Sequence, residues 1–240
     1  MNTVLYSEFY FGNTGRSYEA FKNIGRGGSI FSDSRPTNIK LMGTGAGSGF
    51  SIFPDFRRYA ILFFFKSKGA AESFRRENRQ FAWYLKNSKS ALTALLIPFK
   101  GHGKWGGKEP FDYLNSKVNH KDPIAVITRA TINANRLIEF WSNVPKVASF
   151  MKSAPAIHQV GIGEYPIFMQ ATFSIWESLE SLHKTAYQNT PHAEVVRKTR
   201  ARNWYKEELF AEFLIEKPEF SGPDFQHLEP LTRLQAQNPN

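Results

Sequence analysis

The sequence predicts an α+β fold in which two β-α-β-β-α-β repeats are fused in one chain and packed together as a barrel. The same order of strand-like and helix-like periodicities occurs in residues 1–100 and again in residues 124–217. Between them, residues 101–123 are rich in Gly and Pro, which indicates a linker. A unit of this kind leaves one face of its sheet bare, so two units can bury these faces against each other.

Length and composition indicate an ordinary globular protein. A chain of 240 residues with 41% hydrophobic and 22% charged residues can bury one substantial core. The longest apolar run, residues 59–65, falls far short of the roughly 18 residues that a membrane-spanning helix needs. No basic residue precedes Arg16 and no long apolar stretch occurs there, so the start of the chain does not resemble a secretory signal. A cytoplasmic location is therefore expected.

In the first half, apolar residues alternate as in strands, or recur at helical spacing. The expected strands cover residues 4–11, 39–43, 58–65 and 91–98, and the expected helices cover residues 18–24 and 71–85. The glycine-rich residues 43–50 lack the spacing of a nucleotide-binding loop, so we expect them to connect two strands.

The second half repeats this order with clearer signals. The expected strands cover residues 124–132, 157–163, 167–176 and 209–216, and the expected helices cover residues 137–151, residues 179–186 and a segment that starts at 190. Pro145 should kink the first of these helices, whereas Thr190 and Pro191 suit the N-cap and first position of the last. Residues 164–166 suit a tight hairpin. Four prolines within residues 218–240 predict an extended or disordered tail.

Charge and aromatic content restrict the partners. A net charge of +10 should attract nucleic acid, anionic lipid or an acidic protein. Basic residues cluster on predicted helices, but no segment fits the RNA-binding pattern in which basic residues, Gly and aromatic residues alternate, and the barrel covers the sheet faces. Nucleic acid is therefore disfavoured, and a solvated basic face is expected. Aromatic residues make up 15% of the chain, mostly Phe, which suits a large core or an apolar cavity.

The histidines allow only a simple metal site. The absence of cysteine excludes disulfides, thiolate catalysis and cysteine-ligated metals. The six histidines lack the spacing of a multi-ligand site, which disfavours such a site but still allows a cofactor that needs one protein ligand, and haem is such a cofactor. His192 should face the sheet from the first turn of its predicted helix, and His183 should lie on the apolar face of the preceding helix. For each, the alternative is a partly buried histidine without a ligand role.

Six segments of the chain resemble the spheroidene monooxygenase family of bacterial haem-dependent carotenoid oxygenases. They are GKWGGKEPF (103–111), ITRATI (127–132), GIGEYP (161–166), QATFSIWES (170–178), PHAEVVRKTR (191–200) and WYKEELFAEF (204–213). The resemblance extends over about residues 39–215 and is densest in the second half. It implies a ferredoxin-like α+β barrel and an enzyme that introduces a keto group into an acyclic carotenoid such as spheroidene, using dioxygen and external electrons.

The resemblance also implies a site. His192, in PHAEVVRKTR, is the expected ligand of the iron of haem b. Arg129, which points out of the strand 124–132, is a candidate catalytic residue on the opposite side of the haem, with a structural ion pair as the alternative. A long polyene needs an apolar slot, and each aromatic candidate for it could equally fill the core. These candidates are Phe140, Trp141, Phe168, Phe173 and Trp176.

Three functions stay open at this point. The first is the haem-dependent carotenoid oxygenase, for which the basic surface would suit a ferredoxin-type electron donor and peripheral contact with anionic lipid of the inner membrane. The second is a haem barrel that acts on another small apolar substrate. The third is a non-catalytic basic barrel that binds RNA or lipid.

Overall fold

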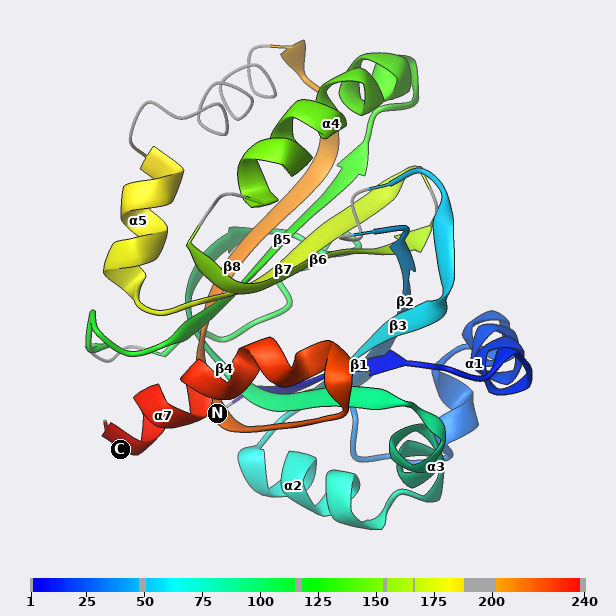
Figure 1. The fold of residues 1–240 in the computed structure, drawn as a ribbon. Helices are drawn as coiled ribbons and strands as arrows, with labels where there is room; N and C mark the ends of the chain where they lie inside the picture. Colours follow the sequence, from blue (N-terminus) through cyan, green and yellow to red (C-terminus); the bar gives the residue numbers. More distant parts are fainter. Residues whose placement is uncertain are drawn as a thin grey trace.

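The protein is a closed antiparallel barrel whose strands follow the order β1-β3-β2-β6-β7-β5-β8-β4, with helices on the outside (Figure 1). The computed structural model describes residues 2–47, 51–114, 118–152, 155–165, 167–187 and 202–237. The predicted α+β barrel is confirmed. None of the helices that the structure describes has the length and apolar character needed to span a bilayer.

The elements have the following bounds. The strands are β1 (Thr3–Tyr10), β2 (Asn38–Gly45), β3 (Pro54–Phe65), β4 (Ser90–Gly103), β5 (Ile124–Ile132), β6 (Ala156–Tyr165), β7 (Met169–Trp176) and β8 (Tyr205–Ser221). The helices are α1 (Thr14–Arg26), α2 (Lys68–Glu77), α3 (Arg79–Asn87), α4 (Leu137–Lys152), α5 (Leu179–Tyr187) and α7 (Glu229–Gln237), with the 3-10 helices η1 (Gly28–Phe31), η2 (Ala134–Arg136) and η3 (Pro223–Leu228).

The strands of the two halves are arranged alike. The first half has the spatial order β4-β1-β3-β2, and the second half has the matching order β8-β5-β7-β6. Two seams join the halves: a short one where Gly43 and Thr44 of β2 pair with β6, and a long one along β4 and β8. Strands of both halves therefore line one closed barrel.

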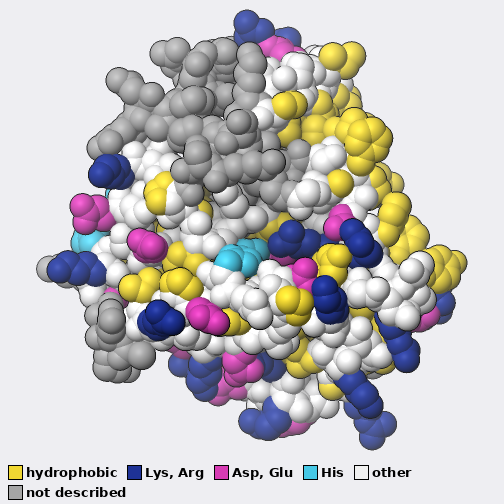
Figure 2. Space-filling view, viewed as in Figure 1, with side chains coloured by type: hydrophobic (Ala, Val, Ile, Leu, Met, Phe, Trp, Pro, Cys, Tyr) yellow, Lys and Arg dark blue, Asp and Glu magenta, His cyan; other side chains and the backbone are white. Residues whose placement is uncertain are grey.

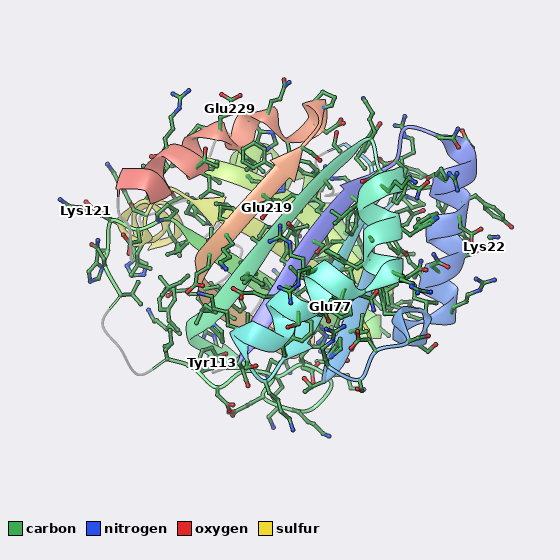
Figure 3. The ribbon with its side chains drawn as sticks, turned by 90° about the horizontal axis from the view of Figure 1, so that it is seen from below. Lys22, Glu77, Tyr113, Lys121, Glu219 and Glu229 are labelled. Atoms are coloured by element: carbon green, nitrogen blue, oxygen red, sulfur yellow. The ribbon has the colours of Figure 1, made fainter. Side chains whose placement is uncertain are left out.

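Side chains from all eight strands fill the barrel, and both ends are closed by segments outside the sheet. Trp105 and Phe111, from the connection after β4, pack on Phe64 at one end. Phe225 and Leu228 of η3 are buried at the other end. On the outside of the first half, α1, α2 and α3 cover an aromatic cluster that includes Phe63, Phe74 and Phe81. Figure 3 shows α2 and α3 lying across the strands of the first half.

Residues 218–237 differ from the expected extended tail. β8 continues to Ser221, and η3 and α7 follow and bury three apolar side chains, Phe225, Leu228 and Leu231. The prolines do not prevent this, because Pro223 and Pro230 lie in the first turns of η3 and α7, where no intrahelical donor is needed.

Three further boundaries differ from the predictions. The single helix expected over residues 71–85 is two helices, because the side chain of Asn78 accepts a hydrogen bond from the Phe81 N–H at 2.9 Å and caps α3 where α2 ends. The hairpin after β6 turns two residues later than expected, and Ile167 has a positive φ of 75° there. β8 spans 17 residues, about twice the expected strand. The helix expected from residue 190 lies outside the described residues.

Candidate functional site

The outer face of the second half's sheet is apolar and buried. Ile124 and Val126 of β5 and Trp176 of β7 point away from the barrel interior and pack against Leu179 and Leu182 of α5. The intervening residues of β5 fill the barrel, so this strand is apolar on both sides, which is typical of a strand that is covered on both faces. We call this surface the outer face.

Glu212 is the notable polar group of the outer face. It lies on β8 between Lys100 of β4 and Val126 of β5, and it is fully buried. Among the described residues, neither of its carboxylate oxygens has a hydrogen-bond partner. Two basic groups lie nearby, Lys100 Nζ at 3.8 Å and His183 Nε2 at 4.0 Å. Burial raises the pKa of Glu212 above its ordinary value, and these basic groups oppose that shift only in part.

For the predicted haem ligand, His192, only its position along the chain between α5 and β8 is known. His192 lies outside the described residues, in the segment that connects α5 to β8. α5 itself packs on the outer face and carries His183 close to Glu212. His102 of β4 stacks on Phe210, which adjoins the same face, at 5.7 Å between ring centroids. Within the described ranges, no group of three or more His, Asp and Glu side chains could hold a metal ion.

Arg129 lies inside the barrel, away from the outer face. Its side chain is 3% exposed, forms an ion pair with Glu207 and has Glu164 Oε2 at 3.4 Å from Nη2. Its guanidinium lies 5.7 Å from the ring centroid of Trp105. These contacts match the structural ion pair that was the alternative for this residue, and the catalytic role stays a prediction.

Two of the five aromatic residues predicted to line a substrate slot point to opposite sides of β7. Trp176 is buried on the outer face, whereas Phe173 is buried inside the barrel and stacks on Tyr6 with 3.6 Å between ring centroids. Side chains three residues apart on a strand face opposite sides of the sheet. These two residues therefore do not share a pocket.

The other three aromatic residues lie around the start of α4. Phe140 and Trp141 contact each other edge to face at 5.6 Å. Trp141 Nε1 donates a hydrogen bond to the carbonyl oxygen of Ile167 at 3.2 Å, and Phe168 follows in the same turn and is 40% exposed. The structure thus distributes the five predicted residues over three places, and of these only Trp176 lies on the outer face.

A buried polar cluster inside the barrel was not predicted from the sequence. Glu8 of β1 accepts hydrogen bonds from the Tyr6 hydroxyl at 2.9 Å and from Arg58 Nε at 2.5 Å. His158 Nε2 lies 2.9 Å from the same carboxylate, and His158 Nδ1 lies 3.0 Å from His227 Nε2 of η3. The only sequence signal was a charged residue within an apolar strand, because no spacing rule connects positions 150 residues apart.

The cluster shifts the pKa values of its members. Burial alone would raise the pKa of Glu8, but the charges of His158 and Arg58 and the hydrogen bonds hold it at about 2. Burial and the neighbouring His158 lower the pKa of His227. The carboxylate is therefore ionised at neutral pH, and the two imidazoles connect it to the surface, where His227 is exposed.

The comparisons with known proteins agree with this architecture. No protein-family model matches the chain. The fold is similar to that of two aldoxime dehydratase structures, one of them in complex with butyraldoxime, with TM-scores of 0.65 and 0.63, 13% and 11% identity, 96% and 91% of this chain covered, and 87% and 81% of those chains. At such low identity, this similarity shows the fold alone.

Relatives are found at higher identity. The chain is 34% identical over 178 residues to the spheroidene monooxygenase of Cereibacter sphaeroides, a match that covers 73% of this chain and 55%, about half, of that protein. It is 33% identical over 180 residues to the spheroidene monooxygenase of Rhodobacter capsulatus, covering 73% of this chain and 74% of that relative. By this similarity, the chain belongs to the spheroidene monooxygenase family.

Proposed function

We propose that the protein is a haem-dependent monooxygenase that inserts oxygen into an acyclic carotenoid such as spheroidene. The observation that carries the proposal is the 33% identity to a relative named spheroidene monooxygenase, over 74% of its length. The matching strand order of the two halves further supports the proposal that they are fused ferredoxin-like repeats.

We propose that haem b binds against the outer face, where apolar side chains and a buried carboxyl group come together. A haem needs apolar walls and one axial ligand. Ile124, Val126 and Trp176 supply an apolar wall, and the segment that contains His192 follows the helix that packs against this wall. The carboxyl group of Glu212, which accepts no hydrogen bond from the described residues, adds a buried polar group at the same place. We assign His192 as the ligand and the outer face as the wall.

Bound haem would supply the dioxygen and electron chemistry that side chains lack. Each hydroxylation combines one carbon–hydrogen bond, one dioxygen, two electrons and two protons to give an alcohol and one water. A second hydroxylation at the same carbon gives a hydrate, which loses water to form the ketone. The two protons per cycle must reach an apolar, buried place.

Glu212 suits the task of holding a proton there. Its burial favours the protonated form, and two basic groups lie near its carboxylate, Lys100 Nζ at 3.8 Å and His183 Nε2 at 4.0 Å. We propose Glu212 as the proton-holding residue of the outer face. The electron donor is proposed to be a ferredoxin-type protein, whose acidic surface would complement the net charge of +10.

The test is a hemin titration of the purified chain, read as the Soret band and repeated after reduction under carbon monoxide. One haem per chain is expected. His192→Ala should lose the saturable band while the far-ultraviolet circular dichroism stays unchanged, and the matched His183→Ala variant should keep it. If only His183→Ala lost the saturable band, the haem ligand would be His183 of α5. No saturable band in the wild type would contradict the haem proposal and favour the non-catalytic basic barrel.

A further inference from the structure

Large apolar side chains are exposed together along one edge of the molecule. Figure 2 shows hydrophobic side chains following the edge that, in Figure 1, carries α1, the β2–β3 hairpin, the β6–β7 turn and the start of α4. Phe53 is 71% exposed and Ile138 is 89% exposed. The other exposed members on these elements are Tyr18, Phe21, Ile52, Phe56, Tyr165, Ile167 and Phe168. We call this set the apolar edge.

The contacts between elements make the apolar edge continuous. The rings of Phe21 on α1 and Phe56 on β3 meet edge to face at 5.5 Å. Beyond the last β2–β3 pair, the Ala46 N–H donates a hydrogen bond to the carbonyl oxygen of Phe53 at 2.8 Å, and the side chain of Phe53 is exposed there. The β6–β7 turn is tied to α4 by Trp141. Contiguous exposed apolar surface of this kind marks an interaction site.

Cations outnumber acids beside the apolar edge. On the same elements and next to them lie six basic residues, Arg16, Lys22, Arg26, Arg57, Arg136 and Arg202. Four acidic residues lie on the described parts of these elements, and each forms an ion pair: Glu19 with Lys22 at 2.6 Å, Asp55 with Arg57 at 3.5 Å, Glu139 with Arg136 at 3.5 Å, and Glu164 with a seventh basic residue, Lys40, at 2.8 Å. The edge therefore combines projecting apolar side chains with a surplus of positive charge.

We propose that the apolar edge docks the protein on a lipid bilayer that contains anionic lipid, with Ile52 and Phe53 inserted between the headgroups. Exposed aromatic and aliphatic side chains flanked by cations match the apolar interior and anionic surface of such a membrane. A second copy of the chain fits poorly, because two surfaces with the same surplus of positive charge would repel. The choice of a bilayer also rests on the proposed function, since a carotenoid dissolves in the membrane.

The experiment is co-sedimentation of the full chain with vesicles of phosphatidylcholine, with and without phosphatidylglycerol. The wild type should bind, and more tightly when phosphatidylglycerol is present and salt is low. The double substitution Ile52→Ser, Phe53→Ser should weaken binding to both vesicles by about tenfold or more, since two large side chains would no longer be buried in lipid. Arg16→Gln with Arg26→Gln should weaken binding to the anionic vesicles only.

The matched control is Leu85→Ser, which removes an exposed apolar side chain of α3, outside the apolar edge. It should bind vesicles like the wild type. Equal binding by the hairpin variant and the wild type would overturn the proposal, as would a wild type that binds neither vesicle. A wild-type dimer in solution that the hairpin substitutions dissociate would overturn it in favour of a second copy. Hemin titration of the same preparations separates this result from a failure of the haem proposal, because the hairpin variant should keep its Soret band.

Discussion

Two glutamates show how surroundings decide the state of a buried carboxyl group. Glu8 and Glu212 are both fully buried on strands of the same barrel. Glu8 has a hydroxyl, a guanidinium and an imidazole around it, and its pKa falls to about 2. Glu212 has no hydrogen-bond partner among the described residues, and burial raises its pKa. The same residue type thus has its pKa lowered by polar and charged partners in one place and raised by burial in the other.

Replacement of Glu212 by Gln should stabilise the protein at alkaline pH. A raised pKa in the folded state means that ionisation destabilises the fold as the pH rises, and Gln removes that ionisation. The free energy of unfolding at pH 8 should rise by about 1 kcal/mol, and the difference from the wild type should vanish near the ordinary Glu value of about pH 4. Urea unfolding at the two pH values measures it. Destabilisation at pH 8 would mean that a cation binds the carboxylate.

Replacement of Glu8 by Gln should have the opposite effect. The pKa of about 2 lies below the ordinary value, so the carboxylate stabilises the fold above that ordinary value and loses this effect as the pH falls toward 2. Glu8→Gln should lower the free energy of unfolding by about 3 kcal/mol at pH 7, and the difference from the wild type should narrow below about pH 4. Thermal unfolding across this pH range tests it, with the neighbouring Ser7→Ala as a control whose effect should not change with pH.

At the scale of elements, the second half was predictable where both faces of a strand are apolar. The expected strand 124–132 coincides with β5, because its run of apolar and β-branched residues is bounded by Pro123 and Asn133. The end of the chain was not predictable from its proline content, since proline is tolerated in the first turn of a helix, and Pro223 and Pro230 both lie there. The composition could not show that Phe225 and Leu228 pack into one end of the barrel.

Deletion of η3 and α7 should therefore open the barrel. A chain that stops at Ser221 loses the burial of Phe225, Leu228 and Leu231 and the contact of His227 with His158. The free energy of unfolding should fall by about 4 kcal/mol or more, which is comparable with the effect of removing a large core side chain. Urea unfolding and binding of a dye that reports exposed apolar surface measure it. Unchanged stability would show that the segment only rests on the barrel.

The candidate site was predictable only in part, because its contacts join residues that are far apart in the sequence. Aromatic residues could be recognised as candidates, but Phe173 and Trp176 could be assigned to opposite faces only once β7 was placed. Glu8 and His158 come from different halves, so their contact depends on closure of the barrel rather than on any local pattern. Glu212 gave no signal at all, because an isolated acidic residue in a strand usually faces solvent.

At the scale of the whole molecule, the two halves depend on each other. Strands of both halves line one closed barrel, and the cluster of Glu8, Arg58 and His158 crosses between them. Residues 1–123 expressed alone should therefore not give a stable monomer, and residues 124–240 should not either. Mixing the two should restore a cooperative thermal transition, followed by circular dichroism. A first half that unfolds cooperatively as a monomer would contradict this dependence.

The pairing of β8 with both β4 and β5 has a consequence for synthesis of the protein. The first half emerges from the ribosome with β2 and β4 as its open edges, and their partners are β6 and β8. β8 ends at Ser221, so the long seam cannot form along its full length until translation has passed residue 221. Unpaired strand edges invite pairing with other chains. The nascent first half therefore needs protection from its neighbours on the polysome for as long as translation of the second half takes.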